Sequence, residues 1–210
     1  MNIINNLKSI KENLISLKSR ATTIVVCKNQ SIVKIKDLIN HGHLDFGENK
    51  VQEAQQKWQE ILNLYKNINL HLIGKLQSNK AKQAFNIFNY IHSLDNEKLA
   101  RSFSDLENFY KRNLKYFVQV NIGDEPQKNG ISTEKLKPFI EYCVSDLKLN
   151  VIGLMCIPPL KGDPSVHFKK LAELAKENNL NELSMGMSND YESAINNGAT
   201  FIRIGSKIFN

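Results

Sequence analysis

The stretch 182-ELSMGMSNDYESAINNGATFIRIGSKIF-209 contains one complete strand–helix–strand unit. Apolar residues dominate 182–188 and 200–209, as in strands of a buried sheet. The intervening segment 188–198 opens with Ser and Asp, which favour the N-cap of a helix, and ends on Gly198. This order predicts two parallel strands joined by a crossover helix.

The same unit recurs toward the N-terminus at a spacing of about 25 residues. Further strands are predicted at 22–28, 44–49, 69–76, 90–95, 116–123 and 150–157. The segments 31–42 and 51–62 each place apolar residues along one helical stripe, and Gly42 follows the first of them as a C-terminal glycine would. Eight alternating units predict an α/β fold, a (β/α)8 TIM barrel, with an open doubly wound sheet as the alternative.

Residues 1–20 precede the first strand and predict an additional helix. Ile3, Leu7, Ile10, Leu14 and Leu17 fall roughly on one face of it, which suggests packing over the barrel. No Pro, Gly or Ser-rich linker divides the remaining chain. We therefore expect one domain, 1–210, made of the helix 1–20 and the barrel 22–209, with no room for a second domain.

The composition excludes several classes of protein. Hydrophobic residues are 41% and charged residues 23%, as in ordinary globular proteins. No apolar run approaches the ~18 residues of a membrane span, and the N-terminal residues are too polar for a signal peptide. We expect a cytoplasmic protein with no membrane partner, and a monomer.

The net charge of +7 raises the possibility of a nucleic-acid partner, but the distribution of charge argues against one. Of the 28 basic residues, 24 are lysines spread along the chain, without a basic block or interleaved aromatics. Cys27, Cys143 and Cys156 form no CxxC pair, and the five histidines show no HxH or HExxH spacing. We expect no nucleic acid, no disulfide framework and no metal site.

Polar residues at the ends of the first two strands are candidates for chemistry, because the active site of such a barrel lies at the carboxyl ends of its strands. Lys28 closes the apolar run 24-IVVC-27. A partly desolvated lysine there could act as a nucleophile that forms a Schiff base, or it could simply extend into water. Asn49 could face the mouth of the barrel, and Glu48 could equally cap the next helix.

The loops after the last two strands predict an anion site. Ser188 follows a glycine-containing strand end, and Gly205 with Ser206 follows the last strand. These loops form the usual phosphate site of the barrel. Arg203, inside an apolar strand, is expected to face either a ligand or a structural carboxylate. A lysine nucleophile opposite a phosphate site fits an aldehyde that carries a phosphate; pyridoxal 5′-phosphate is an example, and class I aldolases fit in part.

Several longer runs resemble one family, the pyridoxal-phosphate homeostasis proteins of the YggS/PROSC type, whose barrel is similar to the N-terminal domain of alanine racemase. The runs are VCK (26–28), FGENKVQEAQQK (46–57), HLIGKLQSNK (71–80), HSLD (92–95), VNIGDEPQKNGI (120–131), GLMCIPP (153–159), LSMGMSNDYESAI (183–195) and IRIGSKIF (202–209). The resemblance implies that Lys28 forms the internal aldimine with pyridoxal 5′-phosphate. It also implies that Ser188, Gly205 and Ser206 hold the phosphate, that Asn49 lines the pocket and that Arg203 faces the pyridine nitrogen.

The function implied is a carrier of pyridoxal 5′-phosphate in vitamin B6 homeostasis, without robust catalysis, which passes the cofactor to apo-enzymes. An arginine beside the ring nitrogen keeps that nitrogen unprotonated and weakens the ring as an electron sink. The racemases also use a tyrosine from another domain, which we do not expect here. The alternative is a slow amino-acid racemase or lyase that uses the same cofactor, and a third possibility is a basic interaction module.

Overall fold

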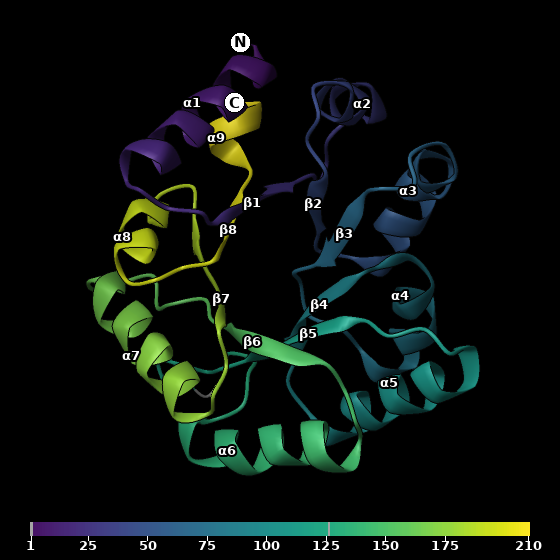
Figure 1. Ribbon diagram of the computed structural model, residues 1–210, viewed down its shortest axis with the longest axis vertical. Helices are drawn as coiled ribbons and strands as arrows, with labels where there is room; N and C mark the ends of the chain where they lie inside the picture. The colour runs from purple at the N-terminus through teal and green to yellow at the C-terminus, as the bar shows by residue number, and fades with distance from the viewer. Residues whose placement is uncertain (1, 126) are drawn as a thin grey trace.

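Short apolar runs form eight parallel strands in the computed structural model, which describes residues 2–125 and 127–210. The strands are β1 (Thr22–Val26), β2 (Asp45–Glu48), β3 (Asn69–Leu72), β4 (Tyr90–Leu94), β5 (Lys115–Gln119), β6 (Val151–Met155), β7 (Glu182–Met187) and β8 (Phe201–Ile204). Each strand pairs with the next one along the chain, and β8 pairs with β1, so the sheet is closed (Figure 1). The predicted TIM barrel is confirmed, and the open sheet is wrong.

Helices surround the barrel and connect its strands. They are α1 (Ile3–Ser16), α2 (Ile32–Asn40), α3 (Val51–Leu64), α4 (Ala81–Ile87), α5 (Glu97–Tyr110), α6 (Thr133–Glu141), α7 (Pro164–Glu177), α8 (Tyr191–Asn196) and α9 (Ser206–Phe209), with short 3₁₀ and π segments at Ser78–Lys80 and Tyr142–Asp146. The predicted N-terminal helix is α1. It lies beside α9, where Asn6 Nδ2 donates a hydrogen bond to the carbonyl of Ile208 at 2.9 Å, so the two ends of the chain are neighbours (Figure 1).

The predicted strands ran too far at their carboxyl ends. The prediction of a strand over 200–209 is wrong beyond Ile204, because Gly205 (φ −122°, ψ −72°) ends the strand and residues 206–209 form the single turn α9. Ile208 is nevertheless buried, since the turn carries it back onto the core. Ser78 begins the 3₁₀ segment without making a capping hydrogen bond, and Lys80 is the residue that precedes α4.

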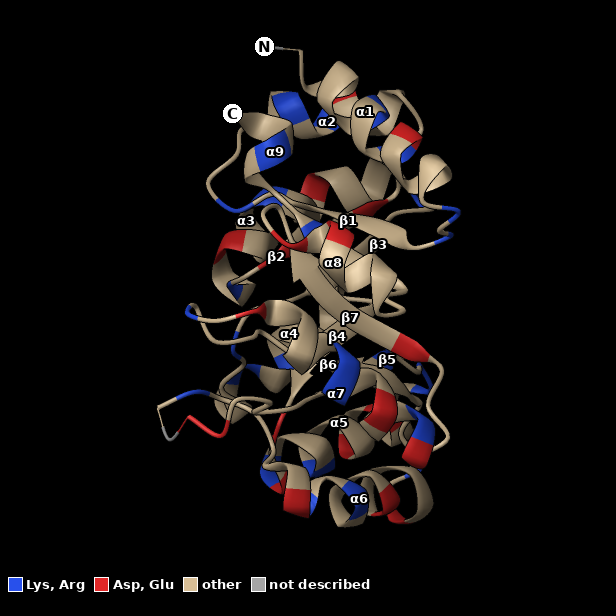
Figure 2. Cartoon of the chain, turned by 90° about the vertical axis from the view of Figure 1, so that its left-hand side faces the viewer, with Lys and Arg blue, Asp and Glu red and all other residues tan. Residues whose placement is uncertain are grey.

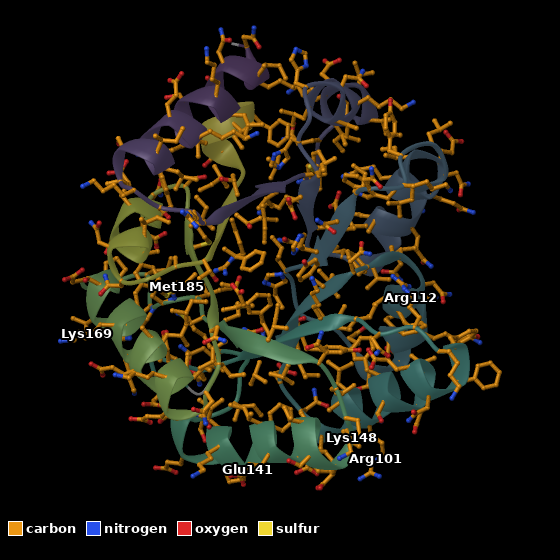
Figure 3. The ribbon with its side chains drawn as sticks, viewed as in Figure 1. Arg101, Arg112, Glu141, Lys148, Lys169 and Met185 are labelled. Atoms are coloured by element: carbon orange, nitrogen blue, oxygen red, sulfur yellow. The ribbon has the colours of Figure 1, made fainter. Side chains whose placement is uncertain are left out.

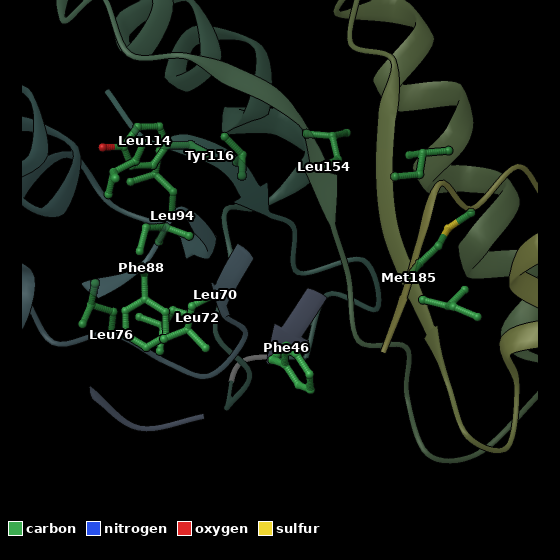
Figure 4. Close-up of a cluster of buried hydrophobic side chains, with 14 of the residues drawn as sticks. Phe46, Leu70, Leu72, Leu76, Phe88, Leu94, Leu114, Tyr116, Leu154 and Met185 are labelled. Atoms are coloured by element: carbon green, nitrogen blue, oxygen red, sulfur yellow. The ribbon is translucent and has the colours of Figure 1, made fainter. Parts of the chain in front are cut away.

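The apolar core has two parts. The larger part fills the layer between the strands and the helices, and Figure 4 shows a portion of it that includes Phe46, Leu72 and Leu154. The smaller part fills the barrel itself and consists of Ile24, Tyr90, Phe117, Met155 and Phe201. A barrel packed in this way is closed, so a ligand can bind only at one of its ends.

Charged residues cover the outside of this structure. Figure 2 shows basic and acidic positions interspersed over the outer helices. Arg112 donates hydrogen bonds to the carbonyls of Phe85 and Phe88, and Arg101 contacts the Tyr142 ring and hydroxyl; both lie on the outer ring (Figure 3). Among the described helices, none combines the length and apolar character that a membrane crossing needs.

Candidate functional site

A cavity of about 480 Å³ opens at the carboxyl end of the barrel, and all six residues predicted for the site line it. They come from four connections: Lys28 after β1, Asn49 after β2, Ser188 after β7, and Arg203, Gly205 and Ser206 at the end of β8. The structure therefore brings together residues that are up to 178 positions apart in the sequence. What each of them does there is argued below.

Lys28 stands two residues beyond β1 at the mouth of the cavity. Its side chain forms no ion pair within the described residues, so the amine is available to a ligand. The next residue, Asn29, has a left-handed backbone (φ 59°), a conformation that asparagine tolerates better than most residues. This turn separates Lys28 from α2 and leaves its side chain exposed.

A buried ion pair fixes the backbone next to Lys28. Glu48 is fully buried, and its Oε1 accepts hydrogen bonds from Lys57 Nζ at 2.8 Å and Trp58 Nε1 at 2.9 Å. Lys57 Nζ also donates to the carbonyl of Cys27 at 2.8 Å. The carboxyl ends of β1 and β2 are thereby tied to α3. Glu48 does not cap the helix, and sequence reasoning missed the role of Lys57, although the run FGENKVQEAQQK contains both residues.

Asn49 lines the cavity because a glycine allows its backbone to pack closely. A Cβ built on Gly74 would lie 2.2 Å from the carbonyl oxygen of Asn49 and 2.8 Å from its Cα. Any side chain at position 74 would therefore displace the backbone of Asn49. This contact explains why the strand predicted over 69–76 ends early, since the chain leaves the sheet where it meets Asn49.

The loops after β7 and β8 meet at Ser188. Its Oγ accepts hydrogen bonds from the backbone amides of Gly205 and Lys207, each at 3.4 Å. These distances are at the long end for N–H···O bonds, so both amides could turn to a stronger acceptor. Asp190 is the N-cap residue of α8, as expected, but its side chain makes no capping hydrogen bond and instead accepts one from the amide of Met187, which holds this loop.

Arg203 is 4% exposed, and neighbouring strands hold its guanidinium. Nη1 donates to the carbonyl oxygen of Ser184 at 2.7 Å and to its Oγ at 2.8 Å, and Nη2 donates to the carbonyl of Cys156 at 2.9 Å. Burial lowers the pKa of Arg203 from its usual value, but an arginine retains its charge at any working pH. Three of the five N–H donors of an arginine are used, and the other two have no partner within the described residues.

Apolar residues form the walls of the cavity between these polar groups. They include Val26, Ile73, Ile157, Pro158, Pro159 and Met187. Sequence reasoning did not identify them as lining residues, although 153-GLMCIPP-159 is one of the quoted runs. Lys28 and Arg203 outweigh Asp190 in charge, so the cavity suits a flat anionic ligand with a group that reacts with an amine.

The thiols of Cys27, Cys143 and Cys156 are free and buried. Across residues 2–125 and 127–210, no group of three His, Cys, Asp or Glu side chains is arranged to hold a metal ion.

Known proteins are similar to this chain in sequence and share its barrel fold. The family model described as "Alanine racemase, N-terminal domain" matches residues 3–210. A pyridoxal phosphate homeostasis protein of Synechocystis sp. is 36% identical over 207 residues and covers 94% of each chain. The structures of PipY from Synechococcus elongatus without and with PLP bound have TM-scores of 0.89 and 0.87, with 35% and 33% identity over the whole of both chains. The chain therefore belongs to the pyridoxal phosphate homeostasis protein family, which shares the barrel of the alanine racemase N-terminal domain.

Proposed function

We propose that this protein binds pyridoxal 5′-phosphate through a reversible Schiff base on Lys28 and takes part in vitamin B6 homeostasis inside the cell. One observation carries the proposal: Lys28, the Ser188–Gly205 contact and Arg203 line a single cavity. The PLP-bound structure of PipY and the names of the curated relatives support the same ligand.

The loop around Ser188 fits the phosphate group. In the part of the chain that the structure describes, the amides of Gly205 and Lys207 bond only to the Ser188 hydroxyl, at 3.4 Å. Phosphate oxygens are charged and would accept shorter, stronger hydrogen bonds from the same amides. The hydroxyls of Ser188 and Ser206 add two further donors at the same place.

The remainder of the cavity fits the pyridine ring. Ile73 and Met187 offer apolar surface for a flat ring, with Asn49 at the edge. Arg203 has two uncommitted N–H donors, and a ring nitrogen can accept one only if it carries no proton. The cofactor supplies an aldehyde that exchanges between amines and, when its ring nitrogen is protonated, a strong electron sink. By keeping the ring nitrogen unprotonated, Arg203 leaves the exchange of the aldehyde between amines possible but makes the ring a weaker electron sink. This combination favours carrying the cofactor over catalysis.

The open mouth supports release as well as binding. Lys28 is exposed, so another amine can reach the carbon that it holds. We infer that the protein is a monomer that consists of one folded domain, and that it passes the cofactor to apo-enzymes. The test of this part is the transfer rate from the loaded protein to an apo-enzyme, compared with the same concentration of free pyridoxal phosphate.

The decisive experiment compares two lysine variants. We expect the wild-type protein to show a visible absorbance band, and borohydride reduction to fix a pyridoxyl group on the peptide that contains Lys28. Lys28→Ala should lose the band and the label, because no other amine occupies that position. Lys50→Ala removes an exposed lysine near Asn49 whose only ion pair in the described structure is with Glu53, so it should keep both. A labelled, coloured Lys28→Ala protein would contradict the proposal.

The alternative is a slow racemase or lyase, which the match to the alanine racemase domain model favours. It predicts that the loaded protein exchanges the α-proton of an amino acid with solvent deuterium, and that Lys28→Ala abolishes the exchange. A carrier without this activity gives no exchange above that of free pyridoxal phosphate.

A further inference from the structure

A line of hydrogen-bonded side chains crosses the interior of the barrel and ends at Arg203. Arg203 Nη1 contacts Ser184 Oγ at 2.8 Å, and Ser184 Oγ contacts His92 Nδ1 at 2.8 Å. His92 Nε2 lies 3.0 Å from His71 Nδ1, and His71 Nε2 lies 3.2 Å from Asp45 Oδ1. We call these five residues the barrel chain.

The barrel chain connects the two ends of the barrel. Arg203 lines the cavity at the carboxyl end, whereas Asp45 is the first residue of β2 and its side chain is 22% exposed at the opposite end. His71, His92 and Ser184 are fully buried between them. They come from strands on facing sides of the barrel, β3 and β4 on one side and β7 on the other (Figure 1).

Aromatic rings hold the two histidines in place. His71 stacks on Tyr90 with ring centroids 4.2 Å apart, and His92 stacks on Phe117 at 4.3 Å. Both aromatic rings belong to the inner core of the barrel. The imidazoles therefore have little freedom to turn, and their nitrogens keep the partners described above.

The charges at the two ends determine where each proton lies. Burial raises the pKa of Asp45, but its interactions with the neighbouring His71, Asn69 and His43 together outweigh burial and leave the pKa below its usual value. Asp45 is thus a carboxylate, which can only accept. Burial lowers the pKa of both His71 and His92, despite the carboxylate beside His71, so both rings are neutral.

Only one arrangement of protons satisfies every contact. His71 must donate from Nε2 to Asp45, which leaves its Nδ1 as an acceptor. His92 must then donate from Nε2, and its own Nδ1 must accept the hydroxyl proton of Ser184. The Ser184 oxygen is left to accept from Arg203. Every donor in the barrel chain points from the cation toward the anion, and bonds aligned in this way strengthen one another in a buried setting.

We propose that His92 and His71 are positioning residues for Arg203: the barrel chain fixes the guanidinium so that its two remaining donors face the cavity, and it stabilises the cation through Asp45 at the opposite end. Where it concerns the bound cofactor, the inference rests on the proposed function. Arg203 forms no ion pair within the described residues, so its buried positive charge is stabilised by the barrel chain and by the carbonyls of Ser184 and Cys156.

The first test needs no cofactor. Two-bond ¹H–¹⁵N correlation spectra of the labelled free protein should show both His71 and His92 as neutral rings with the proton on Nε2. His71→Gln and His92→Gln assign the signals. The Nη protons of Arg203 should also give separate resonances, because three hydrogen bonds hinder rotation of the guanidinium. A proton on Nδ1 of either ring, a charged ring at neutral pH, or a freely rotating guanidinium would overturn the inference.

The second test separates the barrel chain from simple packing. His92→Leu removes both ring nitrogens, whereas His92→Gln retains one donor and one acceptor. We expect His92→Leu to shift the visible band of the loaded protein and to release pyridoxal phosphate about tenfold faster, because a buried hydroxyl and an imidazole lose their partners. His92→Gln should remain close to wild type. Equal effects of the two substitutions would overturn a positioning role.

The third test acts from the far end of the barrel and also covers a failure of His92→Leu to fold. Asp45→Asn removes the charge at the end of the barrel chain and should move the visible band in the same direction as His92→Leu. Glu182→Gln is the matched control, since Glu182 is the first residue of β7 and makes no side-chain hydrogen bond in the described structure. A silent Asp45→Asn would overturn the inference. If the wild type bound no pyridoxal phosphate, the proposed function would fail, and the resonances of Arg203 in these variants would still decide the inference.

Discussion

His43 shows how a single buried side chain links the stability of the barrel to pH. The residue is 5% exposed, and its Nε2 donates to the carbonyl of Asp45 at 2.8 Å. Burial lowers its pKa to about 4, and the charge of nearby Lys11 acts in the same direction, while the hydrogen bond and the charge of Asp45 act against it. The folded protein therefore holds His43 neutral at pH values where the unfolded chain protonates it.

This difference predicts a loss of stability in acid. Between pH 6.5 and about 4 the unfolded state binds the extra proton, so the free energy of unfolding falls as the pH falls through that window. The contribution of His43 is about 3 kcal/mol in full. Urea unfolding of the wild type and of His43→Gln should diverge in this window, with the shallower pH dependence in the variant. Parallel curves would contradict the assignment.

Residues that end strands could be predicted from the sequence, and residues that meet across the barrel could not. The six predicted site residues lie at or just beyond the end of an apolar run, and in a TIM barrel the carboxyl ends of all strands meet at one rim. They are Lys28, Asn49, Ser188, Arg203, Gly205 and Ser206. His71 and His92 show no HxH or HExxH spacing, and nothing else in the sequence near them predicts that they meet. Their contact depends on the register of β3 against β4 and on closure of the barrel.

At the scale of the element, an irregularity in β7 places Ser188. The register between β7 and β8 shifts between Ser184 and Met187, and Gly186 within this stretch has φ +88°. A Cβ at Gly186 would lie 2.5 Å from the Cβ of Ala194 and 3.0 Å from the Cα of Tyr191. The glycine thus allows α8 to pack against β7 while the strand turns Ser188 toward Gly205.

Gly186→Ala should therefore destabilise the fold and weaken binding of pyridoxal phosphate. The left-handed backbone and the clash with α8 together are worth about 2–4 kcal/mol. Gly198→Ala is the matched control: its φ is +90°, but a Cβ there would meet only Leu183 Cδ1 at 3.8 Å, so the expected loss is about 1 kcal/mol without an effect on affinity. Urea midpoints and cofactor titrations measure both. Equal losses in the two variants would show that the clash with α8 is absent.

The number, parallel direction and order of the strands could be predicted from the sequence, but the residues at which they end could not. The pattern of apolar residues continues past β3 and β8 into Ile73 and Ile208, which are buried for other reasons. Ile73 lines the cavity, and Ile208 packs from the turn α9. Hydrophobic periodicity reports burial, and at the rim of a barrel burial is provided by loops as well as by strands.

At the scale of the whole molecule, the two parts of the core share the strands as a common wall. Ile24 and Phe117 face the interior of the barrel, while their neighbours Val25 and Val118 belong to the outer core. Unfolding of either part of the core would therefore expose the apolar side chains of the other part to water. Helix α1 joins the same outer core through Leu7, so we expect it to unfold with the barrel.

We expect the chain to fold as one domain, which predicts one unfolding transition that the cofactor shifts as a whole. Fluorescence of Trp58, the only tryptophan, reports on the packing of α3 against β2, whereas far-ultraviolet circular dichroism reports on all the helices. The two signals should change together in urea.

Because a ligand that binds only the folded state stabilises all of it, pyridoxal phosphate at about a hundred times its Kd should add about 2.7 kcal/mol to both transitions. Lys28→Ala should remove most of that increment without moving the transition of the free protein, since Lys28 is exposed and forms no ion pair in the described structure. Separate transitions, or an increment seen by only one signal, would mean that part of the barrel folds independently of the cofactor site.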